Sequence, residues 1–118
     1  MSADGTMGAP RRGDFDGLQL ALMNNRLEAI VGAMMNTLQR TARSAIMNMA
    51  RDFSCGILTA DNEILTVAES LPCHTFRGPD LQAARMKEWH PDMAQGDALL
   101  HNDPYTGNSH AAAWGILM

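Results

Sequence analysis

Apolar residues recur at three- and four-residue steps between Asp16 and about Arg43. This spacing puts them on one face of an α-helix, so the pattern predicts a long N-terminal helix. Asp16 is expected to cap this helix, because aspartate is a favoured N-cap residue. Gly32, inside the helix, suggests a close helix crossing. The apolar face comprises Leu20, Met23, Leu27, Ile30, Met34 and Leu38. It is expected to be a core or subunit contact rather than a cofactor site.

The next part of the chain favours β-structure. Residues 51–59 and 64–68 are two apolar runs with β-branched residues, and a short Asp-Asn turn separates them, so they predict a β-hairpin. Residues 44–50 are ambiguous and fit either one more helical turn or a loop. Cys55 is expected to be a small buried hydrophobic residue, because no basic side chain lies beside it to activate the thiol.

A second helix and two further strands complete the pattern. Asp80 is expected to cap a helix over residues 81–90, which Pro91 would stop. Its apolar pattern is weak, which is typical of a surface helix. Short apolar runs at 98–100 and from Trp114 onward predict strands. The order of long helix, hairpin, helix, strand and strand is an α+β pattern, and the last strand looks like an incomplete part of a larger fold.

Composition narrows the class of protein. The chain has 118 residues, of which 46% are apolar and 19% charged, and its net charge is -4. These values exclude a mostly disordered chain and give no support to nucleic-acid binding. Residues 1–15 are polar and glycine-rich and are interpreted as a flexible lead-in to one segment over 16–118. Without a membrane-spanning run, a signal peptide or a disulfide framework, the sequence predicts a reduced, cytoplasmic protein.

The densest group of chemically active side chains lies in residues 101–110. This decapeptide holds two histidines, an aspartate, two asparagines, a tyrosine and a serine between two apolar runs. Pro104 and Gly107 bend the backbone so that these side chains can converge. A polar loop held by two strands is a common way to build a site. The alternative is a turn in which Asn and Asp hydrogen-bond their own backbone, and the spacing leaves both readings open.

A second polar loop, residues 71–79, lies between two prolines and contains Cys73 and His74. An adjacent Cys-His pair lacks the spacing of a zinc site, so His74 could equally bond a backbone carbonyl. Neither GxxxxGK[ST] nor GxGxxG occurs in the sequence, so the chain contains no recognisable phosphate-binding loop.

Short segments along the chain share their sequence and their order with one known family. They are Asn25–Ile30, Leu38–Ser44, Arg51–Cys55, Leu71–His74, Gly96-Asp97, Asn102–Tyr105 and Gly107–His110. Taken together, they resemble the N-terminal portion of the hydantoinase B/5-oxoprolinase family, which includes the alpha subunits of acetone and acetophenone carboxylases. The resemblance covers about residues 18–118.

The resemblance implies an enzyme subunit that works in a hetero-oligomer. Family members open cyclic amides such as hydantoin or 5-oxoproline, or carboxylate ketones, after phosphorylation activates the carbonyl group. A hydantoinase A-like partner subunit would bind the ATP, and the substrate would be a small molecule. The alternative is a truncated or degenerate remnant of the family that acts, if at all, as a non-catalytic assembly module.

The resemblance also implies a metal site in the full assembly. In the carboxylase branch, a histidine of the matching loop binds a divalent metal, and His110 matches that histidine. An aspartate three residues later is a second ligand, but Ala113 stands at that position here, and alanine cannot coordinate a cation. Asp103 or His101 could compensate for Ala113. The metal itself could be Mn, Zn or Fe.

The remaining site residues follow from the same resemblance. His74 and Asp103 are expected to be catalytic. His74 would serve either as an acid-base group or as a hydrogen-bond donor that orients the residues in contact with the metal or the substrate. Asn102 and Tyr105 are expected to bind the substrate.

Overall fold

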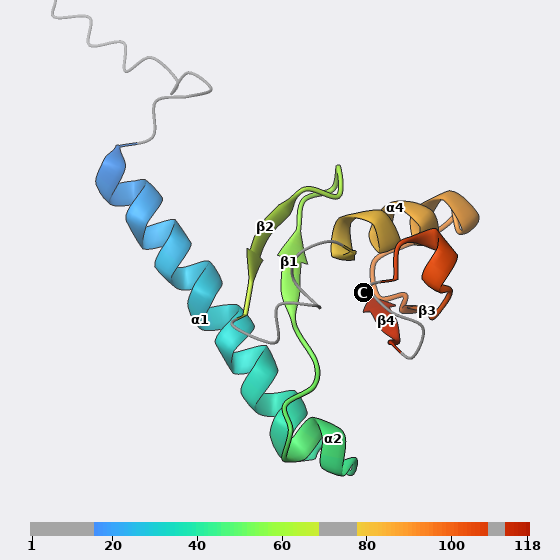
Figure 1. Ribbon diagram of the computed structural model, residues 1–118. Helices are drawn as coiled ribbons and strands as arrows, with labels where there is room; N and C mark the ends of the chain where they lie inside the picture. Colours follow the sequence, from blue (N-terminus) through green and yellow to red (C-terminus); the bar gives the residue numbers. More distant parts are fainter. Residues whose placement is uncertain (1–15, 69–77, 109–112) are drawn as a thin grey trace, which may run out of the picture.

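The computed structural model describes residues 16–68, 78–108 and 113–118. Its elements, in chain order, are α1 (Gly17–Thr41), α2 (Ala45–Asn48), β1 (Gly56–Leu58), β2 (Ile64–Val67), α4 (Pro79–Trp89), β3 (Leu99–His101), the 3-10 turn η1 (Pro104–Thr106) and β4 (Gly115–Leu117) (Figure 1). Two small antiparallel sheets, β1-β2 and β3-β4, accompany the helices. The α+β class with a long first helix, a hairpin, a second helix and further strands is thus confirmed.

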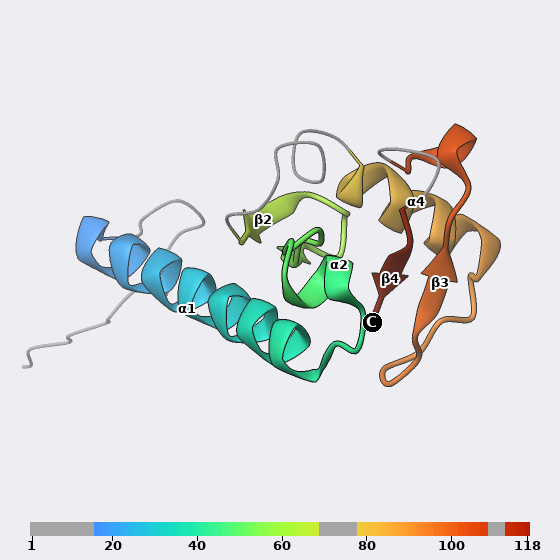
Figure 2. The same cartoon turned by 60° about the horizontal axis from the view of Figure 1, so that its bottom comes forward.

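The long helix α1 begins where the sequence predicted. The side chain of Asp16 accepts a hydrogen bond from the backbone N of Leu18 at 3.5 Å, as an N-cap does. The helix ends at Thr41, slightly earlier than expected, because Ala42 has an extended backbone with φ -63° and ψ 133°. Its C-terminal half lies beside the hairpin, while its N-terminal half projects beyond the other described elements (Figures 1 and 2).

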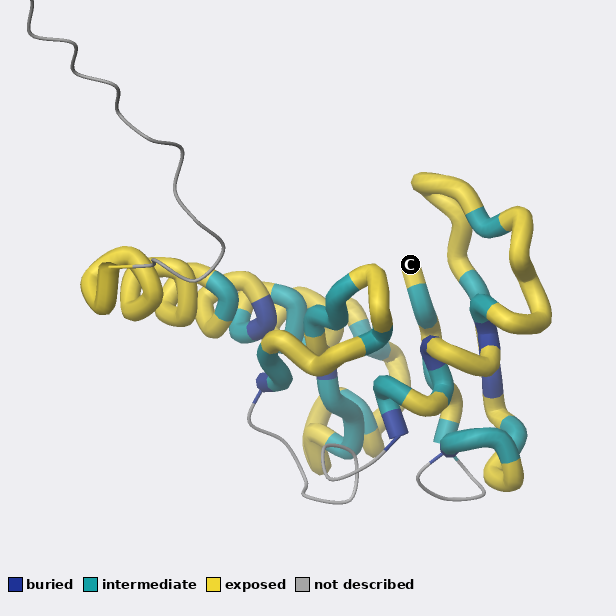
Figure 3. Tube along the Cα trace, turned by 90° about the horizontal axis from the view of Figure 1, so that it is seen from above, coloured by how far each residue is buried: buried dark blue, intermediate teal, exposed yellow. Residues whose placement is uncertain are grey.

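The described elements cover only part of the apolar face of α1. Val31 is buried, whereas Leu20 and Met23 on the same face are exposed (Figure 3). The close helix crossing expected at Gly32 is wrong for the described residues, because a Cβ atom built there meets nothing within 4 Å. Of the six residues predicted for this face, Leu27 and Met34 are half-buried and the other four are exposed, so the described elements cover it only in part.

The segment that the sequence left ambiguous forms the short helix α2. The side chain of Gln39 donates a hydrogen bond to the carbonyl O of Asn48 at 3.0 Å, which ties α2 back to α1. The predicted hairpin follows: β1 and β2 pair antiparallel, with a register shift between Ile57 and Leu58. In its turn, Asn62 adopts φ 67°, a left-handed conformation that asparagine tolerates.

Helix α4 begins earlier than the sequence predicted. Gly78 is its N-cap and Pro79 its first residue, so the expectation that Asp80 caps the helix is wrong. Proline suits this position because its ring presets φ and its missing N–H would have had no partner there. The side chain of Asp80 instead accepts a hydrogen bond from the backbone N of Gly78 at 3.3 Å. On the inner face of α4, Ala83 and Met86 are buried.

Strands β3 and β4 form a hairpin that lies against α4. Leu99 pairs with Leu117 and His101 with Gly115, which confirms the strands expected before and after the decapeptide. The carbonyl O of Ala60, in the β1-β2 turn, accepts a hydrogen bond from Lys87 Nζ at 2.9 Å, so the first hairpin touches α4 at its tip. No helix of the described ranges is both long and apolar enough to cross a membrane.

Candidate functional site

The described part of the decapeptide runs from the end of β3 through η1 and lies against α4. His101 is the last residue of β3 and only 5% exposed. Its ring centroid lies 5.5 Å from that of Trp89, with the two planes tilted by 53°. Its Nε2 lies 3.1 Å from the hydroxyl oxygen of Thr106, within hydrogen-bonding distance. His101 is therefore held inside the fold and is poorly placed to replace a missing metal ligand.

Asp103 shapes the loop through its backbone and its side chain. Its Oδ1 accepts a hydrogen bond from the backbone N of Tyr105 at 2.9 Å, and its carbonyl O accepts one from the backbone N of Thr106 at 3.3 Å. This is the local turn that the sequence allowed as an alternative to a site. Asn102 and Tyr105 are exposed, and Tyr105 is 94% exposed, so both side chains are accessible to a ligand.

The following residues are packed tightly against the start of α4. Gly107 has φ +105°, and a Cβ built on it would lie 2.8 Å from Leu81 Cβ and 3.0 Å from the backbone N of Gln82. Asn108 is only 8% exposed, and its Oδ1 accepts a hydrogen bond from Gln82 Nε2 at 2.6 Å. Its Nδ2 donates to the carbonyl O of Ala113. Sequence reasoning missed Gln82; the weak apolar pattern of its helix carried no signal for this contact.

The described residues do not include His110, on which the predicted metal site depends. They contain no group of three or more His, Cys, Asp or Glu side chains able to hold a metal ion. The side chain of Ala113 offers no ligand, His101 is bonded to Thr106, and Asp103 caps a turn. His110 lies outside the described residues and stays a prediction. The same holds for the catalytic role of His74.

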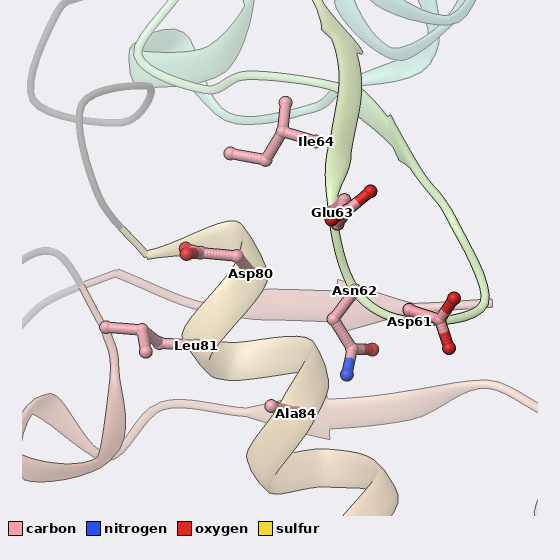
Figure 4. A pocket seen from close by; sticks show the side chains of 7 residues that line it. All are labelled: Asp61, Asn62, Glu63, Ile64, Asp80, Leu81 and Ala84. Atoms are coloured by element: carbon pink, nitrogen blue, oxygen red, sulfur yellow. The ribbon is translucent and has the colours of Figure 1, made fainter. Parts of the chain in front are cut away.

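An open groove of about 430 Å³ lies between the β1-β2 turn and α4, and none of its lining residues belongs to the decapeptide (Figure 4). Three carboxylates, those of Asp61, Glu63 and Asp80, belong to residues that line it. Figure 4 shows that the side chains of Asp61 and Glu63 point away from Asp80, so the carboxylates do not converge. The groove is therefore a boundary between two elements rather than a cation site.

Cys55 is buried, with 8% of its surface exposed, as the sequence predicted. Burial raises the pKa of the Cys55 thiol, because an apolar environment disfavours the thiolate. A raised pKa in the folded state also means that the thiol contributes stability below its unfolded pKa, and this contribution falls as pH rises through the alkaline range.

We expect the Cys55 thiol to resist alkylation in the folded protein. In a Cys73→Ser background, iodoacetamide at mildly alkaline pH should label Cys55 at least about tenfold more slowly than in the urea-unfolded chain, because the thiolate is the reacting species. Mass spectrometry of the labelled peptide measures both rates. Equal rates in the folded and unfolded protein would contradict the burial of this thiol.

A model of the family described as Hydantoinase B/oxoprolinase matches residues 16–118 of the chain. The chain belongs to the hydantoinase B/oxoprolinase family. Among curated members, 5-oxoprolinase 1 of Arabidopsis thaliana is 33% identical over 95 residues, which are 80% of this chain and 8% of that protein. Caprolactamase subunit beta of Pseudomonas jessenii is 30% identical over 95 residues, 80% of this chain and 16% of that subunit.

The similarity extends to a fungal member of the family. The 5-oxoprolinase of Saccharomyces cerevisiae is 27% identical over 97 residues, which are 82% of this chain and 8% of that protein. This hydantoinase B/oxoprolinase chain therefore spans less than a fifth of the length of these curated relatives. No solved structure matches it significantly.

Proposed function

We propose that this chain forms the N-terminal part of a hydrolase subunit that opens a cyclic amide in an ATP-dependent reaction. The observation that carries the proposal is the family match over residues 16–118, together with relatives named 5-oxoprolinase and caprolactamase. Both names denote enzymes that act on lactams. They favour cyclic-amide hydrolysis over ketone carboxylation.

The proposed enzyme is a hetero-oligomer. An amide carbonyl is a poor electrophile, and transfer of a phosphoryl group to its oxygen removes the amide resonance and activates the carbon. The sequence contains no GxxxxGK[ST] motif, so a hydantoinase A-like partner subunit would bind ATP. The relative named caprolactamase subunit beta supports an enzyme of several subunits.

In this proposal the decapeptide faces the substrate. The exposed side chains of Asn102 and Tyr105 would bind the ring, since both carry hydrogen-bonding groups that are accessible. Asp103 and His74 would exchange protons with the attacking water and the leaving nitrogen. His110 would hold a divalent metal or the substrate carbonyl, and a metal at that position would polarise the carbonyl oxygen.

The protein purified with its natural partners tests this function. We expect 5-oxoproline, caprolactam or hydantoin to be converted to its ring-opened product only when ATP and Mg²⁺ are present, with ADP formed in step. Chromatography of both products measures the coupling. Carboxylation of a ketone without lactam hydrolysis would overturn the proposal.

Ala113 favours a second candidate function, that of a non-catalytic assembly module. Alanine at the position of the family's metal-binding aspartate removes a ligand that the carboxylase branch uses. If this candidate is correct, the purified assembly will turn over none of these substrates, and the chain will still co-purify with its partner.

A further inference from the structure

One side chain of α4 connects the two ends of the loop that the proposed function depends on. Gln82 Nε2 donates a hydrogen bond of 2.6 Å to Oδ1 of Asn108, and Nδ2 of Asn108 donates to the carbonyl O of Ala113. The connection is partly shielded from water, because Asn108 is only 8% exposed and Gln82 and Ala113 are half-buried. We call the three residues the amide clasp.

The donor and acceptor atoms of both hydrogen bonds in the amide clasp follow from the backbone carbonyl at one end. A backbone carbonyl can only accept a hydrogen bond, so Asn108 must present its NH₂ group to Ala113 and its oxygen to Gln82. Gln82 must then present its own NH₂ group to Asn108. The Oε1 atom of Gln82 lies against Gly115, where a Cβ would overlap it. A carboxylate at position 82 or 108 would therefore remove an N–H donor from the clasp, and no rotation of the side chain would restore it.

The backbone around the amide clasp is built for close approach. Gly107 passes against Leu81 and Gln82 with no room for a Cβ, and its φ of +105° suits glycine. Gly115 likewise leaves space for the side chain of Gln82. The glycines on both limbs of the loop thus allow one glutamine to reach between them.

We propose that Gln82 and Asn108 are positioning residues for the lactam hydrolysis. They set the separation between Asn108 and Ala113, and the chain between those two residues carries His110. This inference rests on the proposed function of the loop. Because the amide clasp touches neither Asn102 nor Tyr105, its loss should act on the chemical step more than on substrate binding.

Gln82→Glu and Gln82→Met in the full assembly test the proposal as a matched pair. Both keep the length of the side chain, but neither can donate to Asn108 at neutral pH. We expect kcat to fall about tenfold in both variants, since a hydrogen bond lost from a buried partner costs roughly that factor. KM should change by less than about twofold, because the groups expected to bind the ring are unaltered.

The pH profile separates hydrogen bonding from side-chain volume. The carboxyl group that Gln82→Glu introduces can donate to Asn108 once it is protonated. The ratio of Gln82→Glu activity to wild-type activity should therefore recover as pH falls towards the pKa of that carboxyl group, while the Gln82→Met ratio stays flat. Using the ratio cancels the other titratable groups of α4, β3 and the loop, which are the same in both proteins. They are Asp80, Arg85, Lys87, Glu88, His101, Asp103, Tyr105 and His110.

A readout that does not need activity completes the test. Hydrogen exchange of peptides covering residues 107–108 and 113–118 should be about tenfold faster in Gln82→Glu than in wild type at neutral pH, and unchanged in Gln95→Glu, the same replacement at an exposed glutamine. Absence of lactam turnover in the wild type would refute the proposed function alone. Unchanged hydrogen exchange in Gln82→Glu would overturn the proposed role of the amide clasp. Equal losses of kcat in Gln82→Glu and Gln82→Met at every pH would overturn it as well.

Discussion

Replacing His110 with alanine should lower the turnover of the assembled enzyme by about 10³-fold or more. A group that binds a metal or polarises the reacting carbonyl supplies several kcal/mol in the transition state, and alanine supplies none of it. The kcat of ATP-dependent ring opening measures the loss. His90→Ala is a matched control, because His90 is exposed at the C-terminal end of α4, and its turnover should stay within about twofold of wild type. Turnover of His110→Ala within that same range would contradict the role of His110.

Ala113→Asp then distinguishes the two roles open to His110. If His110 holds a metal, a carboxylate three residues later adds a second ligand, and affinity for Mn²⁺ or Zn²⁺ should rise at least about tenfold. If His110 contacts the substrate directly, the affinity will be unchanged. The main-chain carbonyl that Ala113 offers to Asn108 is present in either protein, so the substitution leaves the acceptor of that hydrogen bond in place. Equilibrium dialysis of the assembly measures the affinity.

Gly107→Ala should destabilise the protein by about 3 kcal/mol. Part of this loss is the cost of a positive φ in a residue with a Cβ, about 1–2 kcal/mol. The rest comes from contact, because the new methyl group would lie 2.8 Å from Leu81 Cβ and force the loop away from α4. The midpoint of urea denaturation, compared at equal m-value, measures the change in free energy of unfolding.

Two other glycines provide matched controls for this prediction. Gly96 has φ +100° but open space around its Cβ position, so Gly96→Ala should show only the conformational cost. Gly32 lies in α1 with nothing within 4 Å, so Gly32→Ala should stabilise the protein by up to about 1 kcal/mol. A Gly107→Ala loss no greater than that of Gly96→Ala would show that the loop does not depend on contact with α4.

Local patterns in the sequence predicted most of the secondary structure. The periodic apolar residues after Asp16 identified α1, and the Asp-Asn turn identified the β1-β2 hairpin, because both signals act between residues close in the chain. The predicted start of α4 lies two residues after the observed one. Asp80 and Pro79 are both favoured near a helix start, and the structure has Pro79 as the first helical residue.

The site was less predictable because its contacts join distant parts of the chain. Gln82 and Asn108 are 26 residues apart, and nothing in either neighbourhood indicates their hydrogen bond. Asp103 illustrates a second limit. An aspartate can cap a turn, act as an acid-base group or do both, and only the structure shows that Oδ1 of Asp103 accepts a hydrogen bond from the backbone N of Tyr105. The family resemblance, in contrast, could be recognised from the ordered motifs and is confirmed.

The way contacts divide between the elements has a consequence for spectroscopy. α1 contacts α2 and both strands of the first hairpin, α4 contacts β3, β4 and η1, and Lys87 joins the two groups through Ala60. Weakly joined groups can open as separate cooperative units. Trp89 and Trp114 both belong to the second group, so tryptophan fluorescence would follow that group, while far-ultraviolet circular dichroism would be dominated by α1. Denaturation curves from the two probes need not coincide, and a single two-state fit would then average two different free energies.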